Sequence, residues 1–122
     1  MSFIRVQGLS AGYGKSVVLR NIDLEVHEGE SVAVVGKNGA GKSTLIMSFF
    51  GGTTISKGIL EVDGKILNSK PAFMAAKYGV TISPQGRMIL PHLTVGDNLR
   101  LGAATGRQGR WDMRSVFKLF PV

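Results

Sequence analysis

One glycine-rich stretch of the chain carries residues whose types and spacing suit phosphate binding. Residues 36–43 match the pattern G-x-x-x-x-G-K-[ST] of a phosphate-binding loop, or P-loop. Glycine has no Cβ, so the backbone of such a loop can approach anionic oxygens, and its successive N–H groups form an anion-binding nest. Lys42 could reach the β- and γ-phosphates of a nucleotide, and the Ser43 hydroxyl is a hard ligand suited to Mg²⁺. We therefore expect a nucleoside triphosphate site formed by Gly36, Lys37, Asn38, Gly39, Ala40, Gly41, Lys42, Ser43 and Thr44.

The segments on either side of this P-loop decide between a site and a glycine-rich turn that matches by chance. Residues 31–35, Ser-Val-Ala-Val-Val, are short, apolar and β-branched, which is typical of a buried parallel strand. Residues 44–50 are mostly apolar and precede Gly51 and Gly52, which indicates a helix with a glycine stop. A strand, a glycine-rich loop and a helix in this order favour the nucleotide site.

Length and composition limit what else the chain can be. Its 122 residues suffice for one small domain with a core, and the absence of cysteine excludes a disulfide framework or a thiolate metal site. No signal peptide is expected, because Arg5 interrupts the start and no apolar stretch follows it. No apolar run is long enough to cross a membrane, so any association with a membrane is expected to go through a partner.

Charge is distributed unevenly along the chain. The formal net charge is +7, and six of the eight acidic residues lie at or before Asp63. A basic C-terminal half could bind nucleic acid or another anionic surface, although it lacks the interleaved aromatic residues of a single-strand platform. A solvated or partner-facing surface is the simpler interpretation. The basic residues from position 87 onward are Arg87, Arg100, Arg107, Arg110, Arg114 and Lys118.

Outside the P-loop, the pattern predicts an α/β fold with strands first and helices last. The expected strands are residues 3–7, 17–19, 22–26, 59–62 and 79–83. The expected helices are residues 71–78, 95–101 and 111–120. Residues 8–14 should form a glycine-rich turn, and Asp63-Gly64 is a strong hairpin signal. Thr94 could cap the second of these helices, and Pro121 would end the third.

The order of these motifs resembles the nucleotide-binding domain of ABC transporters. It runs from Tyr13 through the P-loop to Pro84-Gln85-Gly86-Arg87, Leu93-Thr94-Val95 and Asn98-Leu99. Residues 84–95 are similar to the branch that serves branched-chain amino acid and urea importers, and the resemblance covers the chain from Phe3 to Pro121. It implies a truncated P-loop NTPase domain, with an antiparallel β layer and the P-loop half of the core sheet.

The resemblance also implies roles for two residues outside the P-loop. Tyr13 looks like the aromatic residue that stacks on adenine, where the alternative is a turn tyrosine with its hydroxyl in water. Gln85 looks like the glutamine whose amide contacts Mg²⁺ and the attacking water, where the alternative is an ordinary loop glutamine. Many relatives in the amino-acid branch carry glutamate at that position, so Gln85 leans towards the urea-type relatives. Ser43 and Gln85 are therefore the expected Mg²⁺ ligands.

Several features of the family are missing. No L-S-G-G-Q run follows Gln85, and Leu9-Ser10-Ala11-Gly12-Tyr13 lies on the wrong side of the P-loop. His27 is interpreted as a strand-end residue and His92 as a loop residue too early to be the switch histidine. None of the eight acids follows four apolar residues with a second acid beside it, so no complete set of catalytic residues is expected. Without the strand that bears those acids, residues 32–35 would lose a neighbour, which predicts a swapped, oligomeric or marginally stable core.

The resemblance implies the N-terminal portion of an importer ATPase. This chain should bind ATP and Mg²⁺, but by itself it should not hydrolyse ATP. Three parts are expected: a strand-rich adenine side at 1–30, a P-loop core at 31–83, and the glutamine loop with the start of a helical subdomain at 84–122. Implied partners are a transmembrane permease and a second nucleotide-binding subunit at the cytoplasmic face of a prokaryotic membrane, with no direct contact to nucleic acid. The solute would be small and polar, such as a branched-chain amino acid or urea.

Two alternatives come from other classes of protein. One is a non-catalytic basic domain that binds nucleic acid through its C-terminal half. The other is a small complete GTPase or kinase, against which the sequence offers no N-K-x-D guanine motif; Asn68-Ser69-Lys70-Pro71 does not fit it.

Overall fold

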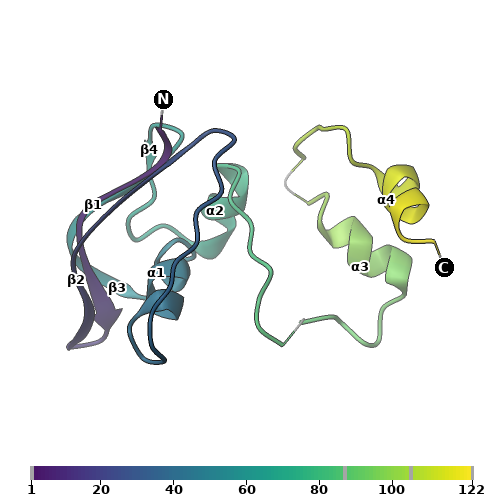
Figure 1. Ribbon diagram of the computed structural model, residues 1–122. Helices are drawn as coiled ribbons and strands as arrows, with labels where there is room; N and C mark the ends of the chain where they lie inside the picture. The colour runs from purple at the N-terminus through teal and green to yellow at the C-terminus, as the bar shows by residue number, and fades with distance from the viewer. Residues whose placement is uncertain (1, 87, 105, 122) are drawn as a thin grey trace. The chain divides into compact units, whose positions relative to one another are not determined.

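The computed structural model describes residues 2–86, 88–104 and 106–121. The chain divides into two compact units, an N-terminal unit that runs to Thr81 and a C-terminal unit that begins at Ile82 (Figure 1). Arg87, part of the predicted glutamine loop and of the basic half, lies outside the described residues.

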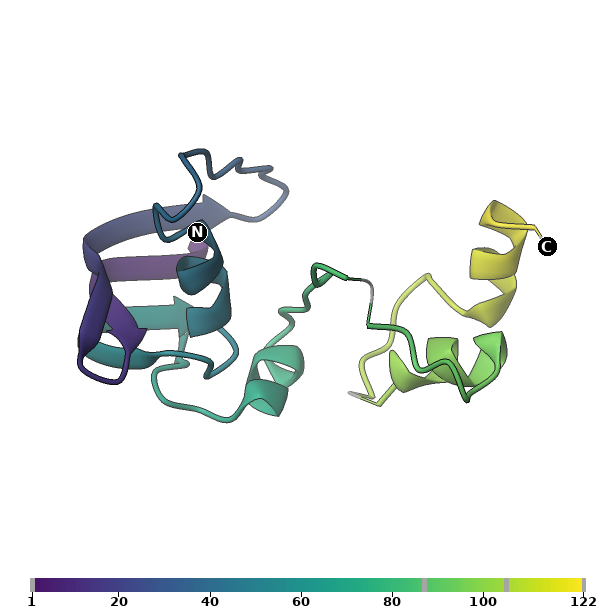
Figure 2. The ribbon, with the colours of Figure 1, turned by 90° about the horizontal axis from the view of Figure 1, so that it is seen from below.

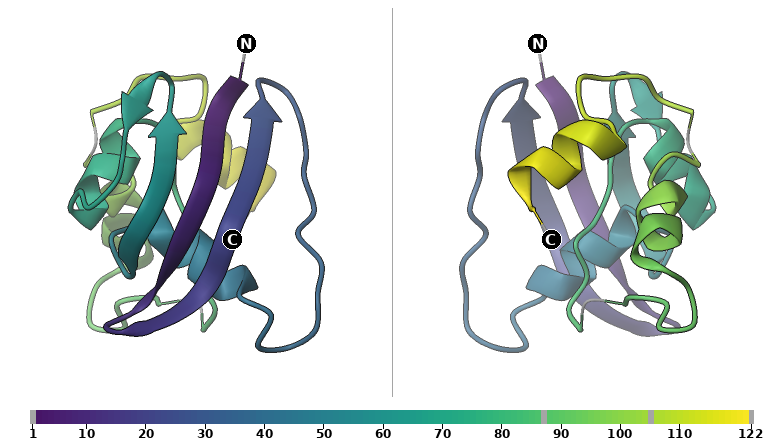
Figure 3. Two further views of the ribbon diagram at one scale, coloured as in Figure 1. Left: turned by 90° about the vertical axis from the view of Figure 1, so that its left-hand side faces the viewer. Right: turned by 90° about the vertical axis from the view of Figure 1, so that its right-hand side faces the viewer.

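An antiparallel sheet of four strands forms the framework of the N-terminal unit. Its strands are β1 (Ser2–Tyr13), β2 (Ser16–His27), β3 (Thr54–Val62) and β4 (Lys65–Ile66). They lie in the order β2-β1-β3-β4, and every neighbouring pair is antiparallel (Figure 3). The predicted antiparallel β layer is therefore present, with longer strands than the sequence pattern indicated.

Two local predictions in this sheet are wrong. Residues 8–13 belong to β1, so the turn is confined to Gly14 and Lys15, and the two predicted strands at 17–19 and 22–26 are one strand, β2. Register shifts between β1 and β2 explain both errors, because they interrupt the alternation without ending the pairing. Asn21 sits at such an irregularity with a φ of 50°.

The Asp63-Gly64 hairpin is confirmed. Both residues have positive φ, 49° and 74°, as a two-residue turn of the primed type requires. The turn joins β3 directly to β4, where Glu61 pairs with Ile66 and Val62 pairs with Lys65.

Two helices pack on one face of the sheet and close the core (Figure 2). They are α1 (Lys42–Ser48) and α2 (Ala72–Lys77). Gly51, with a φ of 70°, follows α1 as the predicted glycine stop, and Pro71 precedes α2. Burial of each leucine or valine side chain in this core stabilises the fold by about 1.5–3 kcal/mol. The buried apolar residues are Val6, Leu9, Ala11, Leu19, Leu45, Phe49, Leu60, Val62, Leu67 and Ala75.

The predicted buried strands at 31–35 and 79–83 are not strands. Both segments are fully described and neither pairs with another strand. Val32, Val34 and Val35 are 44%, 45% and 88% exposed, so the predicted burial is wrong as well. A parallel core strand needs a hydrogen-bonded neighbour and cover on both faces. The four-stranded sheet supplies neither to these segments, so the P-loop half of the core sheet is not assembled among the described residues.

The C-terminal unit contains two short helices, α3 (Val95–Leu101) and α4 (Met113–Leu119). Thr94 caps α3 as predicted, because its Oγ1 accepts a hydrogen bond from the Asp97 N–H at 3.0 Å. Helix α4 begins later than predicted, because Asp112 is its N-cap and forms a capping box with Ser115.

Among the described residues, no helix has the length and apolar character needed to cross a bilayer.

Candidate nucleotide-binding site

The P-loop connects the exposed segment 31–35 to the first turn of α1. Within the loop, the Ala40 N–H donates to the Lys37 carbonyl at 3.1 Å, and the Leu45 N–H donates to the Gly41 carbonyl at 2.9 Å. The first of these bonds closes a turn, and the second begins the helix. The predicted sequence of loop and helix is therefore present, although the predicted strand before it is not.

Gly41 is the P-loop position at which glycine is most strictly required. It has a φ of 103°, a conformation that other residues rarely adopt. A Cβ there would lie 2.8 Å from Leu19 Cδ2, inside van der Waals contact. Gly39 also has positive φ, 82°, but a Cβ there would meet no atom within 4 Å. The loop thus needs Gly41 for backbone conformation and for close packing against β2.

The Lys42 side chain lies back over the loop. Its Nζ donates to the Lys37 carbonyl at 2.8 Å and also to the Gly36 carbonyl. A single ammonium group therefore bridges the start of the loop and the start of α1. This arrangement places a positive charge beside the N–H groups of the helix start, where the oxygens of a phosphate would be stabilised.

A cavity of about 340 Å³ opens at this helix start. It brings together six of the predicted P-loop residues and one that sequence reasoning missed, Val18 of β2, which is 38% exposed. The sequence signal that could have identified Val18 is its place next to Leu19: neighbours in a strand point to opposite faces, so a buried Leu19 leaves the apolar Val18 on the other face of β2. The residues that line the cavity are Val18, Asn38, Gly39, Gly41, Lys42, Ser43 and Thr44.

The cavity fits the phosphate chain of a nucleotide by its donor set. It combines a lysine ammonium, two glycines with left-handed backbone and the hydroxyl of Ser43, which is exposed. Ser43 is also the P-loop residue that could hold Mg²⁺, because a hydroxyl oxygen is a hard ligand.

Tyr13 lies beside this cavity, at the end of β1. Its Oη is 3.4 Å from the Oγ1 of Thr44 in the first turn of α1. Thr44 is buried, whereas Tyr13 is 50% exposed, so the tyrosine is free to offer ring surface to a ligand. The structure thus brings Tyr13 and the P-loop helix together, and the stacking of Tyr13 on adenine stays a prediction.

Other predicted site residues lie apart from the cavity. Gly36, Lys37 and Ala40 are exposed and belong to the loop without lining the cavity. Gln85 is exposed in a turn of the C-terminal unit, and the structure does not position that unit against the P-loop. The pairing of Ser43 and Gln85 as Mg²⁺ ligands therefore stays a prediction.

Carboxylates of this chain are used in local structural contacts. Asp23 accepts a hydrogen bond from the Gly8 N–H at 2.7 Å, and Glu61 pairs with Arg5 at 3.0 Å. The pKa of Glu30 lies below its usual value, chiefly because its carboxylate accepts a hydrogen bond from the His27 backbone N–H and also from the ring. Asp97 pairs with Arg100 at 2.9 Å. None of the residues that line the cavity is acidic.

The fold and the site define a class of protein: a P-loop module in which a helix and an antiparallel sheet shape a nucleotide cavity. The family model described as ABC transporter matches residues 19–121 of the chain. The chain therefore belongs to the ABC transporter family, and the nucleic-acid-binding alternative is not favoured.

Curated relatives agree with this assignment. The chain is 36% identical over 111 residues to the Fe(3+) ions import ATP-binding protein FbpC of Mesorhizobium japonicum, covering 90% of this chain and 31% of that protein. It is 34% identical over 123 residues to the high-affinity branched-chain amino acid transport ATP-binding protein BraG of Pseudomonas aeruginosa, covering 99% and 52%. The chain thus spans about a third to a half of the length of these two relatives.

Solved structures share the fold. An ATP-binding subunit of an ABC transporter superposes with a TM-score of 0.77 at 29% identity, covering 89% of this chain and 45% of that one. A nucleotide-free ATP-binding cassette superposes with a TM-score of 0.65 at 21% identity, covering 98% and 52%, which supports the fold alone. The fold is that of part of an ABC nucleotide-binding domain.

Proposed function

We propose that this chain is the ATP-binding portion of an ABC importer subunit, which binds ATP or ADP with Mg²⁺ at the P-loop. The observation that carries the proposal is the cavity at the start of α1, where the Lys42 side chain lies among the P-loop glycines. Tyr13, held beside that cavity near Thr44, supports adenine as the base. The name of FbpC supports an import function, and that of BraG supports a transport function.

Each site residue has a distinct role in this proposal. The loop N–H groups and the Lys42 ammonium would bind the phosphates, because both offer donors to anionic oxygens. The Ser43 hydroxyl and the Gln85 amide oxygen would hold Mg²⁺, whose charge offsets that of the phosphates when it is bound. The ring of Tyr13 would stack on the adenine.

The assembly would contain a transmembrane permease and a second nucleotide-binding subunit at the cytoplasmic face of a prokaryotic membrane. A branched-chain amino acid or urea is the proposed solute, and the similarity to BraG supports the amino acid. In this assembly, residues 1–30 form the adenine side, 31–83 the P-loop core, and 84–122 the glutamine loop and the start of a helical subdomain.

Binding without turnover is the proposed activity of this chain by itself. Hydrolysis needs a carboxylate to orient or deprotonate the attacking water. Asp23, Glu30, Glu61 and Asp97 are engaged in local contacts, and no acidic residue lines the cavity.

The test is calorimetric titration of Mg·ATP into the chain and into Lys42→Ala. Loss of a charge-assisted contact of about 1.5–3 kcal/mol should weaken binding about 10- to 150-fold. Lys57→Ala is the matched control, because it removes the same charge from an exposed position in β3. Equal ATP affinity in the wild type and in Lys42→Ala would reject the site.

A further inference from the structure

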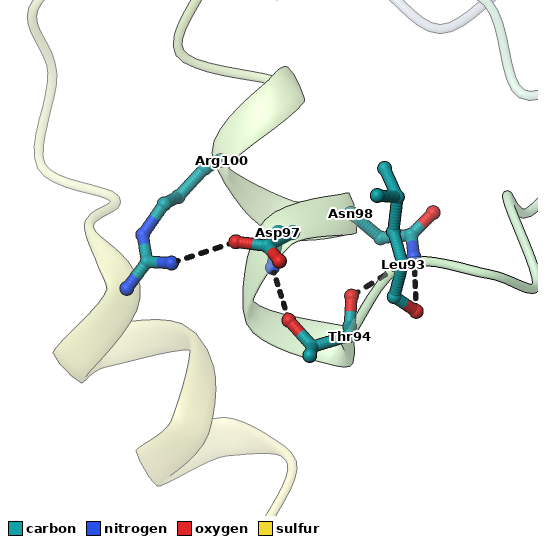
Figure 4. A network of polar contacts seen from close by, with 5 residues as sticks. All are labelled: Leu93, Thr94, Asp97, Asn98 and Arg100. Atoms are coloured by element: carbon teal, nitrogen blue, oxygen red, sulfur yellow. Dashed lines mark hydrogen bonds and ion pairs between the residues drawn. The ribbon is translucent and has the colours of Figure 1, made fainter.

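One side chain in the C-terminal unit makes an unusual number of contacts with the backbone. The Oδ1 of Asn98, in α3, accepts a hydrogen bond from the Leu90 N–H at 3.0 Å. Its Nδ2 donates to the carbonyls of Leu90 at 3.1 Å, Thr94 at 2.9 Å and Leu93 at 3.4 Å (Figure 4 shows the last two). The carboxamide thus pairs with the N–H and the carbonyl of Leu90, and it also binds the carbonyls of Leu93 and Thr94, which precede the helix.

The geometry demands asparagine in particular. The acceptor and the donors of a carboxamide are all used, so aspartate would lose the donors and alanine would lose every contact. The cap of α3 is a separate device, in which Thr94 Oγ1 accepts from the Asp97 N–H and Asp97 pairs with Arg100 on the side away from Leu93 (Figure 4). The contacts of Asn98 therefore fix the segment that precedes α3, whereas the Thr94 cap stabilises the start of the helix itself.

Hydrophobic burial of that segment is incomplete. Met88 and Ile89 are 76% and 63% exposed, and Leu90 and Leu93 are 39% and 37% exposed. Together with side chains of α3 they line a recess of about 690 Å³. Because these side chains stay partly exposed, burial stabilises the segment only in part, and the polar contacts of Asn98 add to the stabilisation of its backbone.

We propose that Asn98 is a positioning residue that fixes residues 88–93 onto α3 and so keeps the recess preformed. The segment begins three positions after Gln85 in the chain. The role goes beyond the proposed nucleotide site, because neither Asn98 nor residues 88–93 are among the described residues that line the cavity at the start of α1. The geometry itself is independent of nucleotide binding.

A similar contact in the N-terminal unit supplies the matched control. The Oδ1 of Asn68 accepts from the Leu60 N–H at 2.7 Å, and its Nδ2 donates to the Gly58 carbonyl at 3.0 Å. Asn68→Ala removes the same chemistry from β3 and leaves the recess untouched. Thr94→Ala removes the cap of α3 and leaves the contacts of Asn98 with Leu90 in place.

Residue-resolved amide hydrogen exchange of the whole chain tests the proposal. In Asn98→Ala, the Leu90 amide should exchange at least tenfold faster, while the amides of residues 99–102 change less than twofold. Asn98→Asp, which keeps an acceptor for Leu90, should raise the Leu90 rate at least threefold and serves if the alanine variant fails to fold. Thr94→Ala should affect Asp97 but not Leu90, and Asn68→Ala should affect Leu60 but not Leu90.

Three outcomes would overturn the proposal. The first is an unchanged exchange rate of the Leu90 amide in both Asn98 variants. The second is an equal rise in exchange rate along α3, which would mean a purely structural role in the helix. The third is an equal effect of Thr94→Ala on the exchange rate of Leu90. Titration with Mg·ATP separates the two proposals, because Asn98→Ala should bind with wild-type affinity. Failure of ATP to bind any variant, with the exchange pattern intact, would reject the nucleotide site and leave the role of Asn98 standing.

Discussion

The hydroxyl of Tyr13 lies 3.4 Å from the hydroxyl of Thr44, although 31 positions separate the two residues in the chain. This contact joins the end of β1 to the first turn of the P-loop helix. It places an aromatic ring that is half exposed next to the cavity at the start of α1.

Tyr13→Ala should therefore weaken nucleotide binding. The loss of base stacking is worth about 1–3 kcal/mol, so the Kd for ATP should rise roughly 5- to 150-fold. Tyr13→Phe keeps the ring and removes only the contact to Thr44, so it should stay within about threefold of the wild type, as a weak, half-exposed hydrogen bond implies. Calorimetric titration measures both. Equal losses in the two variants would show that the hydroxyl matters and the ring does not.

Gly41→Ala should lower the thermal stability of the N-terminal unit more than Gly39→Ala does. Both substitutions force a side chain into left-handed backbone, at a cost of about 1–3 kcal/mol. Only the Cβ at position 41 also meets Leu19 Cδ2, at 2.8 Å. If the clash costs about 1 kcal/mol, Tm should differ by about 4–8 °C between the variants. Similar melting temperatures would mean that β2 does not pack against the loop as described.

The N-cap of α4 should weaken in acid. The pKa of Asp112 lies below its usual value, chiefly because its carboxylate accepts a hydrogen bond from the Ser115 backbone N–H. A lowered pKa in the folded state means that the stabilisation is complete above the ordinary aspartate pKa of about 3.9 and is lost as the pH falls through the lower value. The Ser115 amide resonance should follow this loss in an NMR titration. In Asp112→Asn the cap cannot titrate, so a matching acid transition there would contradict the assignment.

Residues 31–35 should promote self-association of the chain. They are β-branched, exposed and unpaired with any strand of the sheet, and an open apolar segment invites pairing with another chain. Sedimentation velocity should show association that grows with concentration and is reduced by Val34→Lys. Phe120→Lys, at a site that is 68% exposed in the C-terminal unit, is the control for general surface polarity. A monodisperse wild-type monomer at all concentrations would refute the prediction.

Local signals in the sequence predicted local structure well. The Asp63-Gly64 turn, the Thr94 cap and the glycine stop at Gly51 depend on residues within a few positions of each other, and all three are confirmed. The strands predicted at 31–35 and 79–83 depend instead on neighbours distant in the chain. Their composition was typical of a buried strand, but no described strand pairs with them.

The candidate site divides in the same way. The P-loop was recognisable because one contiguous motif carries the groups expected to bind phosphate. Val18 was missed, and Asn98 was noted only as part of the family motif, because their contacts depend on how β2 meets α1 and how α3 meets the preceding loop. Tyr13 was found through the family resemblance, since a tyrosine in a glycine-rich stretch has no spacing signal that links it to Thr44.

NMR mapping of Mg·ATP binding to the isotopically labelled chain locates the nucleotide site residue by residue. We expect saturable shifts of the amides of residues 36–44, with Tyr13 and Val18 among the other residues affected. Lys42→Ala should weaken this response by the factor expected from calorimetry. An absence of shifts at millimolar Mg·ATP, or shifts confined to the basic residues of the C-terminal unit, would contradict the nucleotide site proposed at the P-loop.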